Sequence, residues 1–204
     1  MLYVVSGPSG CGKSTLIRRL VNEMKPGVRF SVSHTTRAKR SMELQGKDYY
    51  FVSEEEFQSL VREGAFLEWA LVHGRLYGTT RQEVESKLEG GDLLLDIDVQ
   101  GARQVRARYP RAVFVFVAPS HPKELKRRLE LRGSNSPESI RERLAAARKE
   151  VESFEEFDYI VINDFLERAV QELRSIIVSG KCRRENRLEE MSSILSSYRL
   201  EADS

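Results

Sequence analysis

Residues 7–14 of the chain read Gly7-Pro8-Ser9-Gly10-Cys11-Gly12-Lys13-Ser14. This octapeptide has the G-x-x-x-x-G-K-S pattern of a P-loop, whose glycines allow backbone N–H groups to wrap a polyphosphate without Cβ clashes. In such a loop the lysine reaches the β- and γ-phosphates, and the serine hydroxyl contacts Mg²⁺. The alternative is a chance glycine-rich turn, which only the neighbouring sequence can exclude.

The sequence on both sides of the octapeptide has the context that a P-loop requires. The apolar run Leu2 to Val5 predicts a buried strand before it. The segment after it predicts a helix that ends at Lys25-Pro26-Gly27, with one apolar face made of Leu16, Ile17, Leu20, Val21 and Met24. A helix N-terminus adds a dipole that favours anions. We therefore predict that Gly7 to Thr15 bind the phosphates of a nucleoside triphosphate.

The composition describes an ordinary globular protein. With 204 residues, the chain is long enough for one domain with inserts or two small domains. A net charge of +2 gives no general electrostatic support for binding nucleic acid. Two cysteines indicate no disulfide framework, which favours a reducing cytoplasm. We expect neither a signal peptide, because the first predicted strand begins at residue 2, nor an apolar run that crosses a membrane.

Three further apolar runs, at residues 92–98, 112–118 and 159–163, predict buried strands. Predicted helices alternate with them, at residues 99–108, 122–131, 137–153 and 164–178. This alternation is typical of an α/β fold with a parallel sheet that helices cover on both faces.

Residues 30–82 interrupt this pattern. We expect short strands of mixed polarity at Phe30 to Ser33, Lys47 to Val52 and Phe66 to Val72, and a short helix near residues 54–63. The sequence therefore predicts an insert of mixed, mostly antiparallel structure between the first helix and the next core strand.

Two arginines near the start of this insert predict an anion site. Arg37 and Arg40 lie three residues apart, just after a predicted strand, and two guanidinium groups suit a dianionic phosphate. Tyr49 and Tyr77 can add hydrogen bonds from their hydroxyls. The alternatives are two solvated arginines and two tyrosines that serve only in packing.

One carboxylate stands in an otherwise apolar predicted strand. If Glu68 is buried, it needs a hydrogen-bond partner. A guanine base offers N1–H and N2–H₂ side by side, which matches one carboxylate. The alternative is a glutamate at a strand edge that faces water.

Two more carboxylates close the predicted strand at residues 92–98. Asp96 and Asp98 are spaced i, i+2, which in a strand places both on one face. Carboxylates at the carboxyl end of a strand beside a P-loop hold Mg²⁺ and its waters. We therefore predict a magnesium site from these residues and Ser14.

Residues 119–146 form a second departure from the regular pattern, rich in Lys and Arg and broken by Gly133 to Pro137. Arg128, Arg132 and Arg143 suit a mobile lid, because phosphoryl transfer spreads charge that arginines can neutralise. A solvated basic helix is the alternative.

In the P-loop, helix-end N–H groups can lower the pKa of Cys11 and give it a redox role, or Cys11 is only a small loop residue.

Taken together, these motifs resemble those of a guanylate kinase over residues 1–180. They are specific in combination, and they comprise Gly7 to Thr15, Ser33 to Arg40, Gly46 to Val52, Phe66 to Ala70, Tyr77 to Thr80, Leu95 to Gly101, Arg128 to Gly133 and Val161 to Asp164. One departure is His34, where the family more often has a small hydroxyl residue.

The resemblance implies a P-loop core of residues 1–30, 83–118 and 147–180, a GMP-binding insert of residues 31–82 and a lid of residues 119–146. It implies the reaction ATP + GMP ⇌ ADP + GDP with Mg²⁺, the use of dGMP as well, and a place in purine nucleotide metabolism. The implied partners are the two small substrates, without nucleic acid or membrane.

The resemblance also implies a role for each matching residue. ATP would contact Gly7 to Thr15 and, near its adenine, Asn163. The GMP phosphate would contact Arg37, Arg40, Tyr49 and Tyr77, and its base Ser33, Glu68, Thr79 and Asp98. Lys13, Arg37, Arg128, Arg132 and Arg143 would be catalytic. Ser14, Asp96 and Asp98 would hold the metal, the two carboxylates through water.

Two other functions stay open at this point. One is a kinase for a different nucleotide or a sugar phosphate, against which Ser33 and Glu68 favour guanine. The other is a scaffold that binds phosphopeptides without catalysis, against which stand the intact Gly12-Lys13-Ser14 and the two carboxylates.

The tail at residues 181–204 lies outside the resemblance. Leu188, Met191, Leu195 and Tyr198 predict a helix with one apolar face. This helix packs back on its own domain or makes a subunit contact in a homodimer.

Overall fold

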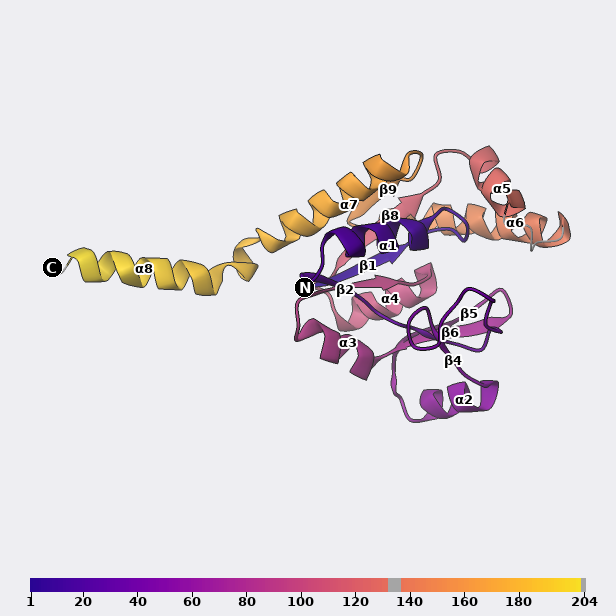
Figure 1. The fold of residues 1–204 in the computed structure, drawn as a ribbon, viewed down its shortest axis with the longest axis horizontal. Coiled ribbons are helices and arrows are strands. Elements are labelled where there is room, and N and C mark those ends of the chain that lie inside the picture. Colours follow the sequence, from indigo (N-terminus) through magenta and orange to yellow (C-terminus); the bar gives the residue numbers. More distant parts are fainter. Residues whose placement is uncertain (132–136, 203–204) are drawn as a thin grey trace.

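The computed structural model describes residues 1–131 and 137–202 (Figure 1). Its centre is a five-stranded sheet in which every pairing is parallel, as the sequence predicts. The strands lie in the order β2-β7-β1-β8-β9, with bounds β1 Leu2–Ser6, β2 Val28–Phe30, β7 Asp92–Asp96, β8 Val113–Ala118 and β9 Tyr159–Ile162.

Helices cover both faces of this sheet because the side chains of each strand alternate. Tyr3 and Val5 of β1 pack against α1 (Lys13–Glu23) and α7 (Leu166–Lys181). Leu2 and Val4 belong to a second cluster that includes residues of α3 (Arg81–Leu88) and α4 (Val99–Arg108). The two faces thus hold separate apolar cores.

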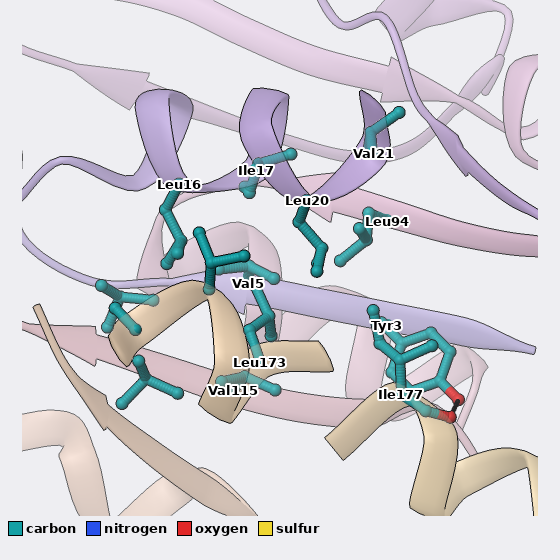
Figure 2. Packing of buried hydrophobic residues seen from close by; sticks show 14 of the residues in the cluster. Tyr3, Val5, Leu16, Ile17, Leu20, Val21, Leu94, Val115, Leu173 and Ile177 are labelled. Atoms are coloured by element: carbon teal, nitrogen blue, oxygen red, sulfur yellow. Dashed lines mark hydrogen bonds between the residues drawn. The ribbon is translucent and has the colours of Figure 1, made fainter. Parts of the chain in front are cut away.

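The first of these cores is drawn in Figure 2, where Leu16, Ile17 and Leu20 of α1 face the strands. The hydroxyl of Tyr3 lies in this core and donates a 3.0 Å hydrogen bond to the carbonyl of Ile177 in α7. This bond satisfies a buried hydroxyl that would otherwise be costly.

The insert forms a second, four-stranded sheet in the order β4-β3-β6-β5. Its elements are β3 His34–Thr35, β4 Tyr50–Phe51, α2 Glu54–Arg62, β5 Phe66–Val72 and β6 Arg75–Thr80. β3 pairs with β4 in parallel, and the β3–β6 and β5–β6 pairs are antiparallel. Phe57 of α2 stacks on Phe66 at 4.5 Å between ring centres, which gives the insert its own small core.

One predicted strand of this region is wrong. The sequence analysis places a strand of the insert at Phe30 to Ser33, whereas the strand is β2, Val28–Phe30, at the edge of the core sheet. It pairs with β7, where Val28 faces Asp92. Such pairing joins segments some sixty residues apart, which a local pattern does not reveal. β6 and α3 correspond to no strand or helix predicted from the sequence.

Two helices make the arm that the sequence analysis describes as a lid. They are α5 (Pro122–Leu131) and α6 (Pro137–Glu152), which pack together through Leu125, Leu129, Ile140 and Ala147. Arg132 lies outside the described residues. A short 3₁₀ turn, η1 (Ser153–Glu156), leads from α6 towards β9.

The chain ends in η2 (Arg184–Asn186) and α8 (Leu188–Ala202), which points away from the body of the molecule (Figure 1). The predicted apolar residues of α8 are exposed, for example Leu188 at 55% and Tyr198 at 70%. The interpretation that this helix packs on its own domain is therefore wrong. Within the described residues, none of the helices has the length and apolar character needed to cross a bilayer.

Candidate active site

The P-loop joins β1 to α1 in a conformation that requires glycine. Gly7, Gly10 and Gly12 have φ angles of 137°, 96° and 97°. A Cβ on Gly7 would lie 2.1 Å from the carbonyl oxygen of Val117, and one on Gly12 would lie 2.5 Å from Nδ2 of Asn163. Both the backbone angles and the close neighbours therefore exclude larger side chains.

Lys13 begins α1 and folds back over the loop. Its Nζ donates to the carbonyl oxygens of Gly7 at 2.5 Å and Pro8 at 3.3 Å. Burial alone would lower the pKa of Lys13, but nearby negative groups, among them Asp96 and Glu150, raise it. The lysine is therefore a cation at neutral pH.

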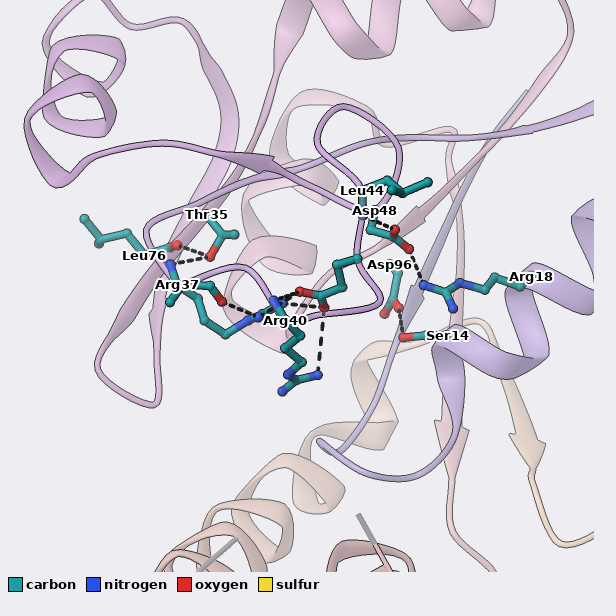
Figure 3. Close-up of polar contacts among 11 residues, drawn as sticks. Ser14, Arg18, Thr35, Arg37, Arg40, Leu44, Asp48, Leu76 and Asp96 are labelled. Carbon is teal, nitrogen blue, oxygen red and sulfur yellow. Dashed lines mark hydrogen bonds and ion pairs between the residues drawn. The ribbon is translucent and has the colours of Figure 1, made fainter. Parts of the chain in front are cut away.

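Figure 3 shows the side chains of Ser14 and Asp96 together, and the charges of Asp96 and Lys13 act on each other. The Ser14 hydroxyl donates to Oδ2 of Asp96 at 3.2 Å, because Asp96 ends β7 beside β1. Burial raises the pKa of Asp96, against the opposing effect of Lys13. Among the described residues, no group of three or more His, Cys, Asp or Glu residues could hold a metal ion. The two oxygen donors suit Mg²⁺, which keeps several waters and binds substrate phosphates.

Asp98 does not lie on a strand face with Asp96, so that expectation is wrong. β7 ends at Asp96, and Asp98 is the N-cap of α4, where its carboxylate accepts from the Gly101 N–H at 2.9 Å. Aspartate is a favoured N-cap residue, and this local bond competes with continuation of the strand.

Across from the P-loop elements, Glu68 of β5 is buried, with 3% of its surface exposed, so the alternative of a glutamate facing water is wrong. The Thr79 hydroxyl donates to its Oε1 at 2.6 Å, and the Ser33 hydroxyl lies 2.9 Å from that of Thr79. Burial raises the pKa of Glu68 to about 7. A Cβ on Gly101 would lie 2.4 Å from Oε2 of Glu68, which places this carboxylate against the start of α4.

The two insert arginines lie close together, and Figure 3 shows Arg37 and Arg40 directed towards the same carboxylate, that of Glu43. Arg37 lies 5.5 Å from the ring centre of Tyr49, whose ring centre is 5.9 Å from that of Tyr77. The structure thus brings together all four residues that the sequence analysis assigned to a phosphate.

The cluster formed by Arg37, Arg40, Tyr49 and Tyr77 also lies near the core. Burial and the negative charge of Asp96 raise the pKa of Tyr49, so the insert and the end of β7 are within electrostatic reach of each other. In addition, Arg18 of α1 forms an ion pair with Asp48 of the insert (Figure 3).

The arm contacts the P-loop through its arginines. Arg128 donates through Nη1 to the carbonyl of Cys11 at 2.8 Å and through Nη2 to the carbonyl of Asn163 at 2.9 Å. The side-chain amide of Asn163 also donates to the Cys11 carbonyl, at 2.7 Å. Nη1 of Arg143 is 3.5 Å from the Ser9 hydroxyl. Both arginines therefore converge on the loop instead of lying on a solvated helix face.

Of the two interpretations of Cys11, the reactive thiol with a lowered pKa is wrong. Its side chain is buried, and burial raises the pKa of the thiol. A neutral, inaccessible thiol is unreactive, so Cys11 serves as a small packing residue.

Sequence reasoning missed two carboxylates of this region, Glu43 and Glu150. Glu150 of α6 reaches the loop. Burial raises the pKa of Glu150, and the charge of Lys13 and a hydrogen bond from the Ser9 backbone oppose this rise. Both are single acidic residues in polar segments, and no spacing distinguishes them from solvated ones.

This combination of a parallel sheet, a P-loop with a lysine and a serine, and a separate arginine pair is that of a P-loop protein whose insert carries a cluster of positive charge. A family model described as guanylate kinase matches residues 1–180. The guanylate kinase of Geobacter metallireducens is 47% identical over 184 residues, 90% of each chain. That of Symbiobacterium thermophilum is 50% identical over 184 residues, 90% of this chain and 87% of the relative.

Solved structures agree with the sequence comparisons. The crystal structure of guanylate kinase from Anaplasma phagocytophilum has a TM-score of 0.74 and 33% identity, with 90% of this chain and 87% of that chain covered. The chain therefore belongs to the guanylate kinase family.

Proposed function

We propose that this protein transfers the γ-phosphoryl group of ATP to the phosphate of GMP, which yields ADP and GDP. Family membership supports the reaction. The observation that supports the acceptor base is the buried chain from Glu68 through Thr79 to Ser33. The carboxylate accepts from guanine N1–H and N2–H₂, and the two hydroxyls reach O6 and N7.

The donor side of the site consists of the P-loop and the arm. Gly7 to Thr15 hold the phosphates of ATP, and Asn163 lies near its adenine. Lys13, Arg128, Arg143 and Arg132 neutralise the charge of the transferred group. The contacts of Arg128 and Arg143 with the loop support their part in this role.

The acceptor side consists of the insert. Arg37 and Arg40 bind the GMP phosphate, and the hydroxyls of Tyr49 and Tyr77 complete its shell. Asp98, at the start of α4, also faces the guanine pocket, because its charge helps to raise the pKa of Glu68.

The chemistry needs no general base, because the attacking oxygen of GMP is already anionic near neutral pH. The protein supplies alignment and charge neutralisation, and closure of the insert and the arm excludes water that would hydrolyse ATP. Mg²⁺ fits Ser14 and, through water, Asp96 and Asp98, and when bound it would neutralise phosphate charge.

The two cysteines are free, which supports a reducing compartment, and we place the protein in the cytoplasm.

A coupled assay with ATP and each nucleoside monophosphate tests the proposal. We expect GMP to be the best acceptor and dGMP to be used less efficiently. AMP places an unprotonated N1 against Glu68, and an unmatched buried carboxylate costs about ten- to a hundredfold in kcat/KM. CMP and UMP should be poor for lack of the purine contacts. Equal use of AMP and GMP would contradict the assignment of the base pocket.

A further inference from the structure

Glu43 lies in the loop between β3 and β4, and its carboxylate forms ion pairs with both Arg37 and Arg40. Its side chain is 13% exposed. Oε1 accepts from Nη2 of Arg37 at 2.7 Å and Oε2 accepts from Nη1 at 3.0 Å. Two parallel charge-assisted bonds of this kind fix the plane of a guanidinium group as well as its position.

The same carboxylate fixes the backbone at Arg40. Oε2 accepts from the Arg40 N–H at 2.9 Å, and the Glu43 N–H donates to the Arg40 carbonyl at 3.1 Å. The guanidinium of Arg40 is held less firmly, since its Nη1 lies 3.9 Å from Oε1 and its side chain is 59% exposed. One acidic side chain thus anchors Arg37 completely and Arg40 at its main chain.

Arg37 keeps donors for a second anion in this arrangement. A guanidinium has five N–H donors. Glu43 engages one N–H on Nη1 and one on Nη2, and the carbonyl of Ala38 accepts from Nη1 at 2.7 Å. The side chain of Tyr77 also hydrogen-bonds with this guanidinium. Glu43 itself leaves the Nε–H and the second N–H of Nη2 to other acceptors, which a phosphate oxygen can be.

The remaining contacts hold Arg37 in the same place. Its N–H donates to the hydroxyl of Thr35 at 3.1 Å, and that hydroxyl donates to the carbonyl of Leu76 on β6 (Figure 3). The rings of Tyr49 and Phe51 lie 5.5 and 5.7 Å from its Cζ. The guanidinium is therefore enclosed before any ligand binds.

The charges of the group suit a phosphate dianion. Burial alone would raise the pKa of Glu43, but hydrogen bonds from Arg37 and from the Arg40 amide lower it. The carboxylate of Glu43 is therefore ionised at neutral pH. The carboxylate separates two guanidinium charges that would otherwise repel each other. One excess positive charge remains to attract the ligand.

We propose that Glu43 is a positioning residue for the acceptor phosphate. It holds Arg37 rigid, with a preformed donor edge, so that less conformational entropy is lost when GMP binds. Arg40, whose guanidinium is mostly solvated, closes on the phosphate afterwards. This inference rests on the proposed function, because it takes the phosphate of GMP as the ligand of the two arginines.

The opposite role would be that of a competitor, in which the Glu43 carboxylate imitates the phosphate and must be displaced. The two roles predict effects of opposite sign. Removal of a competitor strengthens GMP binding, whereas removal of a positioning residue weakens it.

The experiment compares the full-length wild type with Glu43→Gln and Glu43→Asp. KM is measured for GMP and for ATP, and calorimetry measures the affinities of GMP and of guanosine, which lacks the phosphate. Glu55→Gln is the matched control, because Glu55 is an exposed glutamate of α2 in the same insert.

For Glu43→Gln we expect KM for GMP to rise about ten- to a hundredfold, the usual effect of losing bonds to a charged group. KM for ATP and the affinity for guanosine should stay within about twofold of wild type. Glu43→Asp keeps the charge on a shorter side chain and should recover part of the GMP affinity. Glu55→Gln should match wild type throughout.

Three results would overturn the inference. They are an unchanged KM for GMP, a lower KM for GMP as a competitor predicts, and an equal loss of GMP and guanosine affinity, which indicates misfolding of the insert. If the wild type itself fails to phosphorylate GMP, the proposed function is wrong and this inference falls with it.

Discussion

At the scale of single residues, the site places a negative charge where the fold disfavours it. Glu68 is buried against the start of α4, and its main hydrogen bond comes from one threonine hydroxyl. Burial accordingly raises its pKa to about 7. Under the proposed function, guanine supplies two N–H donors to this carboxylate and offsets the cost of its burial.

This conflict predicts a pH dependence that is specific to GMP. Guanine needs the ionised carboxylate, so kcat/KM for GMP should fall as the pH drops from 8 to 6, through the pKa of about 7. KM for ATP should change little over that range. Glu68→Gln should lower kcat/KM for GMP at pH 8 about ten- to a hundredfold and remove the acid limb of the profile. An acid limb that persists in the variant would assign it to another group.

The same group makes a prediction about stability. Its folded pKa of about 7 exceeds the ordinary value of 4.5, so the folded state retains a proton that the unfolded state releases. This contribution is present in full below pH 4.5 and is lost as the pH rises through 7. Between pH 5 and pH 8, the free energy of unfolding of Glu68→Gln should therefore rise relative to that of wild type by up to about 3 kcal/mol. Urea unfolding at both pH values measures it, and an unchanged difference would contradict the raised pKa.

At the scale of elements, the insert depends on the core for the protection of an edge strand. β5 is the last strand of its sheet, and its free edge faces α4. The side chain of Gln104 donates to the Trp69 carbonyl at 2.7 Å and accepts from the Trp69 N–H at 3.2 Å, as a neighbouring strand would. Arg108 donates to the carbonyl of Phe66 at 3.0 Å. These bonds satisfy backbone groups that otherwise invite association with other chains.

We predict that Gln104→Ala destabilises the insert by about 1–3 kcal/mol, because it leaves both backbone groups of Trp69 without these partners. Trp69 is the single tryptophan of the chain, so its fluorescence reports unfolding at this position. Gln82→Ala, at an exposed position of α3, is the control and should have no measurable effect. Equal stability of the two variants would show that water replaces the Gln104 bonds.

At the scale of the whole molecule, α8 is a helix that contributes to none of the apolar cores found among the described residues. The helix points away from the sheet (Figure 1), and five of its large apolar side chains are exposed, those of Leu188, Met191, Ile194, Leu195 and Tyr198. An isolated helix of 15 residues is marginal in water, so packing against something else must support it. A second copy suits this role, because an antiparallel pair places Glu189 and Glu190 of one helix near Arg199 of the other.

We therefore predict a homodimer through α8, which light scattering coupled to size exclusion measures at several concentrations. Leu195→Glu places a charge in the apolar stripe and should give a monomer with unchanged kcat/KM, since α8 lies far from the P-loop. Ser193→Glu, on another face of the helix, should leave the dimer intact. A wild type that is monomeric at every concentration would exclude this assembly.

The parts of this protein that depend on local interactions could be predicted from the order of its residues. The P-loop follows from glycines that alone tolerate its backbone angles, and α1 follows from its apolar spacing. The alternation of buried runs and helices was sufficient for the parallel sheet. Motifs such as the Arg37–Arg40 pair were visible because their members are neighbours in the chain.

Features that depend on contacts between distant segments could not be predicted in this way and are seen only in the folded chain. β2 belongs to the core sheet because it pairs with β7, and Asp98 caps α4 instead of continuing the strand. Burial, which no local pattern reports, raised the pKa of Cys11 where the loop alone suggested a lower one. Glu43 gained its role from the position of Arg37, because the energy of a charged side chain depends on which groups surround it and on how much water reaches it.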